Sequence, residues 1–300
     1  MKYIYSIIIP HYNSPHLLKR MLESIPERED IQVVVVDDAS TKENVEALNQ
    51  LHHKNLELLL QQNNRGAGYA RNVGLEHAIG QWVIVVDSDD VFAPDAFDVF
   101  DKYKDQNIDY LGFCIKCVDT EDLKFNGHKI VSDESVRKYL KNNSQHNLFL
   151  YKYKNTVCWN KLVSNDFLKK NDIKFEDCQV NNDVLYALLV GYYAESFKVI
   201  SDELYYFAIN SDSITHKKRT IEREFLFYLQ AQKRNGFYKA LGLTRYPFYR
   251  ADYLYIPFML KKRGVKDTLS FFTLIWHNRN QRREARNAYL RYIRNDYIRE

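Results

Sequence analysis

Residues 83–90, VIVVDSDD, decide the fold class, because four apolar residues run directly into three carboxylates. An uncharged run rich in β-branched residues predicts a strand buried on both faces. The carboxylates then lie where the strand leaves the sheet, which is the edge at which open α/β sheets bind ligands. Three neighbouring acids repel one another, so a functional interpretation needs a counter-charge, and a divalent cation carrying a diphosphate supplies one. The alternative is a solvated turn whose Asp caps a helix at residues 91–94.

Three similar strand-to-helix units precede this stretch. The first has an apolar run at residues 6–9 and a helical pattern from Pro15. The second has four Val at residues 33–36, two carboxylates and a helix expected from about Lys42 to His52. The third has an apolar run at residues 56–60, a glycine-containing turn and another helix. This alternation predicts a mostly parallel α/β sheet with helices on both faces, whose polar strand ends meet along one edge.

Four of these segments together resemble the successive motifs of family 2 glycosyltransferases of the GT-A fold. They are residues 6–13, 36–40, 64–74 and 87–90, in the family's order and spacing. The resemblance implies the nucleotide-diphospho-sugar transferase fold and an inverting transferase of the type that builds bacterial cell-surface polysaccharides. It also implies a nucleotide sugar donor, commonly UDP-linked, and Mn²⁺ or Mg²⁺ as cofactor.

The same resemblance assigns a nucleotide site. Pro10 and Tyr12 match positions that shape the uracil pocket. Asp38 matches the carboxylate that accepts the N3–H of the base, with Asp37 as its supporting neighbour. Arg71 matches an arginine near the diphosphate, a role that suits a permanently charged guanidinium. The alternative for Arg71 is an ion pair on a helix surface.

The D-x-D sequence supplies the expected metal site. Asp87 matches a ribose or metal-water partner, Ser88 lies beside it in the donor site, and Asp89 matches the direct metal ligand. Asp90 is a further candidate ligand. His216, in a polar loop, is a candidate for the metal shell or the diphosphate, because imidazole binds such metals. The alternative is that His216 is simply solvated.

An inverting displacement also needs a base near the acceptor hydroxyl. The candidate is Asp183 in Asn182-Asp183-Val184-Leu185-Tyr186, which resembles the family's acidic pair with Asn in place of the first acid. Glu176 and Asp177 are the alternative bases. Trp159 and Lys161 are candidates for the acceptor site, one stacking on a sugar and the other approaching a phosphate. For Trp159, burial in the core is an equally good interpretation.

Length and composition limit the architecture. With 300 residues and 45% hydrophobic content, we expect a catalytic domain over residues 1–216, with a nucleotide half (1–100) and an acceptor half (101–216). A helical extension follows at 217–300. The four cysteines include one C-x-x-C on a predicted strand, where the two thiols face opposite sides, so we expect reduced thiols in a cytoplasmic protein. No signal peptide or membrane-spanning segment is expected from the sequence.

Positive charge is concentrated at the C-terminal end. Residues 217–300 contain 20 Lys or Arg and 7 Asp or Glu, a net charge of +13, which leaves −9 for residues 1–216. Basic, aromatic-rich helices suit the surface of an anionic membrane, so one interpretation is peripheral attachment at the inner face of the cell membrane. The alternatives are a helical bundle packed on the catalytic domain and a homodimer contact.

Other function classes fit less well. A nucleotidyltransferase typically begins with a glycine-rich phosphate loop, whereas the first predicted strand ends in Pro10-His11-Tyr12-Asn13. A nucleic-acid-binding module would use the basic C-terminal region, but the acidic first 216 residues oppose it and no recognised motif is present. The favoured function is sugar transfer to a saccharide or a lipid-linked saccharide. No residue identifies the donor sugar, the linkage or the acceptor.

Overall fold

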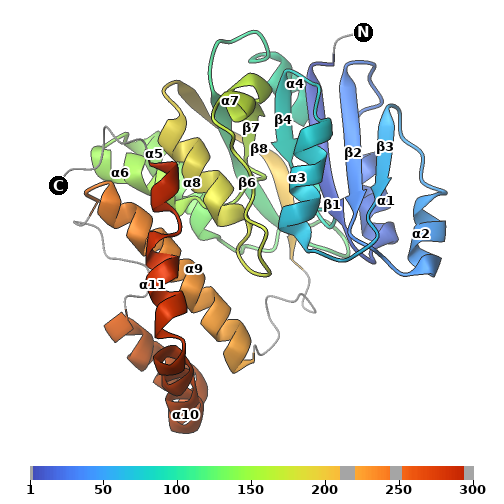
Figure 1. The fold of residues 1–300 in the computed structure, drawn as a ribbon. Helices are drawn as coiled ribbons and strands as arrows, with labels where there is room; N and C mark the ends of the chain where they lie inside the picture. The colour runs from blue at the N-terminus through green and yellow to red at the C-terminus, as the bar shows by residue number, and fades with distance from the viewer. Residues whose placement is uncertain (1–2, 210–219, 244–251, 294–300) are drawn as a thin grey trace. The chain divides into compact units, whose positions relative to one another are not determined.

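The computed structural model describes residues 3–209, 220–243 and 252–293 (Figure 1). The chain divides into two compact units. We call the first, which comprises residues 1–178 and 182–213, the α/β unit. The second, which comprises residues 179–181 and 214–300, is the helical unit. The predicted boundary between residues 216 and 217 lies outside the described residues.

An eight-stranded sheet forms the centre of the α/β unit, with strand order β3-β2-β1-β4-β7-β6-β8-β5. The pairs β1/β2, β2/β3, β1/β4 and β6/β8 are parallel, and β4/β7, β6/β7 and β5/β8 are antiparallel. The predicted mostly parallel sheet is therefore confirmed. The strands are β1 (Tyr5–His11), β2 (Ile31–Asp37), β3 (Leu56–Leu60), β4 (Trp82–Val85), β5 (Val91–Phe92), β6 (Tyr110–Asp119), β7 (Lys161–Ser164) and β8 (Phe197–Ile209).

Helices lie on both faces of this sheet (Figure 1). The helix expected from about Lys42 to His52 ends at Leu48. The alternative interpretation of a capped helix at residues 91–94 is wrong, because Val91 and Phe92 pair with β8 and the next helix starts at Ala96. The helices are α1 (Pro15–Glu23), α2 (Lys42–Leu48), α3 (Ala67–His77), α4 (Ala96–Asp101), α5 (Val131–Lys141), α6 (Gln145–Phe149), the π-helix η1 (Leu150–Lys154), α7 (Asn165–Lys170) and α8 (Asp183–Tyr193).

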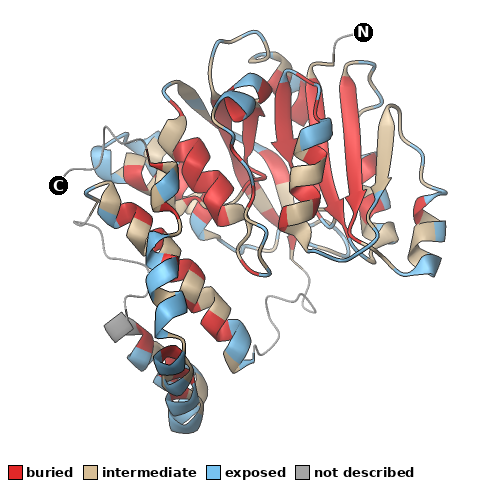
Figure 2. Cartoon of the chain, viewed as in Figure 1, coloured by how far each residue is buried: buried red, intermediate tan, exposed pale blue. Residues whose placement is uncertain are grey.

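The core of the α/β unit follows from its apolar runs. Every residue of β1, β2 and β4 is buried (Figure 2), as predicted for strands covered on both faces. Helix α3 packs on β1 and β2 through Gly74, where a Cβ atom would meet the side chains of Ile8 and Val36. This close approach sets the position of Arg71, one turn earlier in α3.

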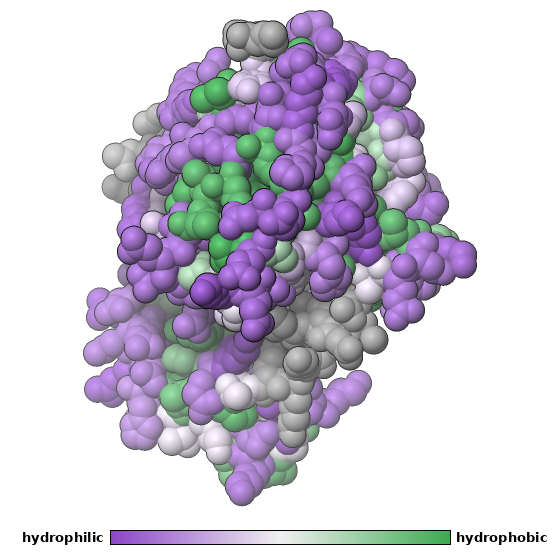
Figure 3. Space-filling view, turned by 90° about the vertical axis from the view of Figure 1, so that its right-hand side faces the viewer, coloured by the Kyte–Doolittle hydropathy of each residue, from purple (hydrophilic) through white to green (hydrophobic). Residues whose placement is uncertain are grey.

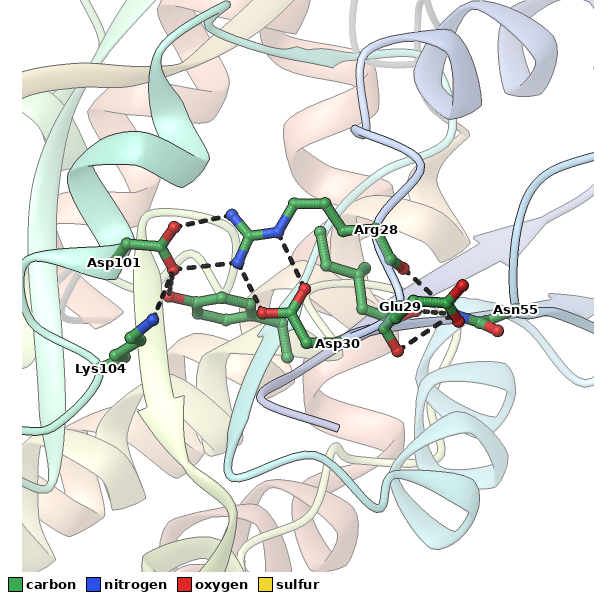
Figure 4. Close-up of polar contacts among 8 residues, drawn as sticks. Arg28, Glu29, Asp30, Asn55, Asp101 and Lys104 are labelled. Atoms are coloured by element: carbon green, nitrogen blue, oxygen red, sulfur yellow. Dashed lines mark hydrogen bonds and ion pairs between the residues drawn. The ribbon is translucent and has the colours of Figure 1, made fainter. Parts of the chain in front are cut away.

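A charged cluster joins the start of β2 to α4 (Figure 4). The Arg28 guanidinium donates to Asp30 through Nε and Nη2 (2.9 and 2.6 Å) and to Asp101 through Nη1 and Nη2 (2.7 and 3.1 Å). The Tyr5 hydroxyl also donates to Asp101 at 3.0 Å. The side chains of Arg28, Asp30 and Asp101 are about one quarter exposed, whereas Tyr5 is buried. Such a bidentate, partly shielded arrangement stabilises more than a typical surface ion pair.

The edge strand β3 carries hydrophobic residues to the surface of the α/β unit. Leu56, Leu58 and Leu59 are half-buried and Leu60 is 47% exposed. Figure 3 views the molecule from the right-hand side of Figure 1 and shows hydrophobic residues gathered among hydrophilic ones.

The helical unit has its own small core. Its elements are α9 (Ile221–Ala240), α10 (Asp252–His277), α11 (Arg279–Asn287) and the 3₁₀ helix η2 (Leu290–Tyr292). Helix α10 is interrupted at Gly264, whose φ of +80° favours glycine. None of the helices in the described residues is both long and apolar enough to cross a membrane. The core residues are Phe225, Tyr228, Tyr255, Met259, Phe271 and Ile275.

Candidate active site

The parallel register brings the predicted donor residues to one edge of the sheet. His11 pairs with Asp37, and Ile8 pairs with both Val34 and Val85. The ends of β1 and β2 therefore lie side by side, β4 ends opposite Ile8, and the residues that follow all three strands share the carboxyl edge of the sheet. This is the edge at which α/β sheets bind ligands.

A buried histidine holds the first of these strand ends. His11 is 2% exposed, and its Nε2 accepts from the Ser14 amide at 3.0 Å, so Nδ1 carries the proton and donates to Asp37 at 2.8 Å. Asp37 also accepts from the Ser40 amide at 2.9 Å and from the Ser40 hydroxyl at 2.5 Å. Burial raises the pKa of Asp37, but these hydrogen bonds outweigh it and hold the pKa below its usual value. Asp37 thus supports the loop after β1.

Asp38 holds the loop that leads into α3. Its two carboxylate oxygens accept from the amides of Arg65 and Gly66, at 2.8 and 2.6 Å. Each oxygen keeps a second lone pair. Pro10 is buried in β1, whereas Tyr12 is 50% exposed, which suits a side chain that covers a bound ring.

The three carboxylates after β4 converge. Oxygens of Asp87, Asp89 and Asp90 lie within 4.8 Å of one another, and in the described part of the chain these three acids form the cluster that could hold a metal ion. Asp87 and Ser88 are half-buried, Asp89 is exposed and Asp90 is fully buried. Burial and the neighbouring carboxylates raise the pKa of Asp90 well above its usual value. A cluster of carboxylate oxygens, the hard ligands that these ions prefer, fits Mg²⁺ or Mn²⁺.

We call residues 87–90 the acidic loop. Two residues that the sequence analysis missed hold this loop in place. The Tyr205 hydroxyl donates to Asp90 at 2.6 Å and accepts from the Asp87 amide at 3.0 Å. Arg20 donates to the backbone carbonyl of Asp89 at 2.5 Å and to the carbonyl of Thr120. No local pattern signals either residue, because the contacts join positions 69 to 118 residues apart.

Arg71 joins the acidic loop to the start of α8. It is 7% exposed, and its Nη2 donates to Asp87 while its Nη1 donates to Asn182, both at 2.5 Å. The next residue of α3, Asn72, exchanges two hydrogen bonds with the backbone of Phe175, at 2.9 and 2.8 Å. Arg71 is therefore part of the candidate site and not of a surface ion pair. Asn182, which stands in place of the first acid of the family's pair, accepts a hydrogen bond from Arg71.

Asp183 is the first residue of α8 and follows Asn182 directly. Loss of hydration and the negative charge of Asp87 raise its pKa to about 6, although the charges of Arg71 and Lys161 act in the opposite direction. The carboxylate is therefore mostly ionised at neutral pH. Its pKa lies closer to neutrality than that of a solvated Asp, which favours proton transfer.

The two candidates for the acceptor site lie inside the protein. Trp159 is 4% exposed and stacks on Tyr205 and Phe207, with ring centroids 5.3 and 5.4 Å away, so the structure favours the core interpretation. Lys161 is 2% exposed. Its Nζ donates to the carbonyls of Val157 at 2.8 Å and Asn155 at 3.4 Å and to the Asn160 side chain at 2.9 Å. Burial lowers the pKa of Lys161 to about 7.

The remaining candidates are dispersed. Asp177 is 47% exposed and pairs with Arg65 at 2.5 Å, and the Glu176 amide donates to the carbonyl of Asn182 at 3.1 Å. Neither residue belongs to a helix, so the alternative interpretation, in which both are charges that stabilise a helix N-terminus, does not apply. His216 lies outside the described residues.

Comparisons with known proteins agree with this geometry. The sequence pattern of glycosyl transferase family 2 matches residues 6–170, more than half of the chain. The chain belongs to this glycosyltransferase family. The match confirms the resemblance seen in the sequence and the expectation of a glycosyltransferase.

Relatives include the poly(ribitol-phosphate) β-N-acetylglucosaminyltransferase TarS of Staphylococcus aureus, which is 30% identical over 68% of this chain and 35% of its own length. The poly(ribitol-phosphate) β-glucosyltransferase of Bacillus spizizenii is 26% identical over 69% of this chain and 32% of its own length. The chain thus spans about a third of the length of these relatives. Crystalline S. aureus TarS 1–349 in complex with UDP-GlcNAc has a TM-score of 0.63 at 21% identity, covering 97% of this chain and 82% of that one. This likeness confirms the GT-A fold.

Proposed function

We propose that this protein transfers a sugar, with inversion, from a UDP-sugar to a hydroxyl group of a saccharide or lipid-linked saccharide. The observation that carries the proposal is the position of Arg71 between Asp87 and Asn182, since this one guanidinium joins the acidic loop to the start of α8. A donor diphosphate and an acceptor base must meet across the anomeric carbon, and this arrangement holds both elements together.

On the donor side, Asp38 would accept the N3–H of uracil beside Pro10 and Tyr12, with Asp37 supporting it. Arg71 and the half-buried Asp87 and Ser88 would bind the ribose and diphosphate. The fixed positive charge of Arg71 stabilises the charge that grows on the departing diphosphate.

Asp89, Asp87 and Asp90 would hold Mg²⁺ or Mn²⁺. When bound, the cation acts as a Lewis acid that neutralises the diphosphate. Asp89, which is exposed, is the residue best placed to reach a ligand in solution, whereas Tyr205 and the Ala208 amide already occupy the buried Asp90.

On the acceptor side, Asp183 would act as the general base. The acceptor oxygen bonds to the anomeric carbon as its proton moves to the Asp183 carboxylate. The bond from the anomeric carbon to the diphosphate breaks, and its electron pair leaves with UDP. Trp159 and Lys161 would support the acceptor site from inside the protein. Lys161 would do so through its hydrogen bonds to residues 155, 157 and 160.

The names of the two relatives favour N-acetylglucosamine or glucose as the donor sugar and a hydroxyl-bearing surface polymer as the acceptor. We place the reaction in the cytoplasm, at the inner face of the membrane. The buried thiols of Cys114, Cys117 and Cys158 fit a reducing compartment.

A donor screen tests the proposal. Purified protein with Mn²⁺ is offered a panel of UDP, GDP and CDP sugars, and the release of free nucleotide is measured. We expect release from UDP-sugars, and a loss of orders of magnitude in excess chelator and in Asp89→Asn, which keeps the side-chain volume but removes the charge.

The matched control is Asp122→Asn, an acid in the turn after β6 that pairs with Lys124. It should behave like the unmodified protein. Full release in chelator, or an unchanged Asp89→Asn protein, would show that the acidic loop does not use a metal.

A further inference from the structure

Helix α10 exposes a row of large apolar residues. Val265, Leu269 and Trp276 are 66%, 64% and 72% exposed. At 100° per residue, they lie within about 40° of one another around the helix axis. The buried residues Phe271 and Ile275 point to a different side and fill the core of the helical unit. This row is therefore not the helix face that packs.

The helical segment before the interruption at Gly264 also exposes large apolar residues, since Ile256 and Leu260 are 43% and 42% exposed. Five of the eleven large hydrophobic residues that are exposed in the described part of the chain belong to α10. We call the row after Gly264, namely Val265, Leu269 and Trp276, the α10 apolar surface. A concentration of this kind marks an interaction site.

Exposed basic side chains lie on the same helix and on the next one. They are Lys261, Lys266 and Lys262 on α10, the last of which also pairs with Glu224 at 3.0 Å, and Arg279 and Arg283 on α11. They belong to the 84-residue stretch with a net charge of +13. Apolar residues that enter a lipid boundary, with Lys and Arg beside them, are characteristic of helices that lie on an anionic membrane.

Charge decides between a membrane and a second copy of the chain. In a symmetric dimer through this surface, the exposed Lys and Arg of one copy would face those of the other copy and repel them. An anionic bilayer attracts each nearby Lys or Arg. We propose that the α10 apolar surface binds the surface of an anionic phospholipid bilayer, with the helix lying in the interface.

Intrinsic fluorescence tests this inference directly. The chain has three tryptophans, of which Trp82 and Trp159 are 2% and 4% exposed, so only Trp276 faces solvent. The full chain is mixed with vesicles of phosphatidylcholine alone or of phosphatidylcholine with phosphatidylglycerol. We expect the emission to shift to shorter wavelength only with the anionic vesicles, and the shift to shrink at high salt, which screens the charges.

Leu269→Glu should weaken sedimentation with anionic vesicles by about tenfold or more, because it places a charge where an apolar side chain would enter lipid. The control is Leu60→Glu, which alters an exposed leucine of the α/β unit and should leave binding unchanged. An unshifted emission, equal loss in both variants, or a dimer in sedimentation that Leu269→Glu dissociates would each overturn the proposal. The measurement uses neither donor nor acceptor, so it is independent of the transferase assignment.

Discussion

Asp38 is the residue on which nucleotide selectivity depends in this account. Its carboxylate is 3% exposed and is already oriented by the amides of Arg65 and Gly66. Uracil offers an N3–H to this carboxylate, whereas cytosine has no proton on N3 and would leave two acceptors facing each other. We therefore expect UDP to bind at least about tenfold more tightly than CDP. Equal affinities in calorimetry would show that Asp38 does not contact the base in this way.

Tyr205 tests whether the geometry of the acidic loop matters. Tyr205→Phe keeps the ring that stacks on Trp159 but removes the hydroxyl, leaving Asp90 with one donor fewer and the Asp87 amide without this acceptor. A buried polar group that loses its partner costs about 1–3 kcal/mol. We expect a lower melting temperature and a weaker apparent affinity for Mn²⁺ in the presence of UDP.

The control for this variant is Tyr206→Phe, one residue along β8. Tyr206 is half-buried and its ring faces Lys116 instead of the acidic loop. It should leave metal affinity unchanged. If Tyr205→Phe lowers the melting temperature but binds Mn²⁺ as tightly as the unmodified protein, then Tyr205 supports the fold alone.

At the residue scale, the sequence predicted the positions at strand ends but not the side chains that hold them. Asp37, Asp38 and Asp87 follow apolar runs, so their place at the sheet edge could be read from the pattern. Arg20 and Tyr205 contact the acidic loop from a distant helix and strand, and their local sequences show only amphipathic or apolar character. The stacking of Trp159 in the core likewise depends on β8, which approaches it only in the folded chain.

At the element scale, alternation of strands and helices was sufficient to predict the parallel part of the sheet. It did not predict the strand at residues 91–92, where Val91 and Phe92 pair with Tyr206 and Tyr205 although the Asp before them favours a helix cap. Pairing with a strand more than a hundred residues away outweighed the local capping signal. This pairing also carries Tyr205 to the acidic loop.

The Arg28 cluster gives a prediction for the link between β2 and α4. Hydrogen bonds from Arg28 lower the pKa of Asp30, and together with Tyr5 they outweigh burial and lower the pKa of Asp101. A lowered carboxylate pKa contributes stability above the unfolded value, near 3.9, that is lost as pH falls through the folded value. Arg28→Met should therefore lower the free energy of unfolding by about 2 kcal/mol at pH 7.

Denaturant unfolding measured at several pH values tests whether the stability that Arg28 contributes is lost at low pH. The difference between the two proteins should stay constant down to about pH 5 and shrink below about pH 4. Lys54→Met is the control, because its ion pair with Glu29 is exposed and should contribute less than about 0.5 kcal/mol. A difference that grows at low pH would contradict the assigned roles of Asp30 and Asp101.

At the scale of the whole molecule, charge and chemistry divide between the two units. The α/β unit contains every described residue proposed for the reaction, whereas the helical unit contains the α10 apolar surface. The imbalance between −9 and +13 was evident in the sequence. Which α10 residues are exposed was not, because their apolar pattern is the same as that of the residues that fill the core.

The central claim is that Asp183 takes the acceptor proton while Arg71 and the acidic loop bind the donor. Asp183→Asn tests it most directly, with UDP binding in Mn²⁺ measured by calorimetry and sugar transfer measured on the donor found in the screen. Asp177→Asn, an exposed acid six residues earlier, is the matched control. We predict that Asp183→Asn binds UDP as tightly as the unmodified protein and loses a factor of about 10² to 10⁴ in transfer. Loss of UDP binding with an unchanged rate at saturating donor would instead make Asp183 a donor-site residue and contradict the account.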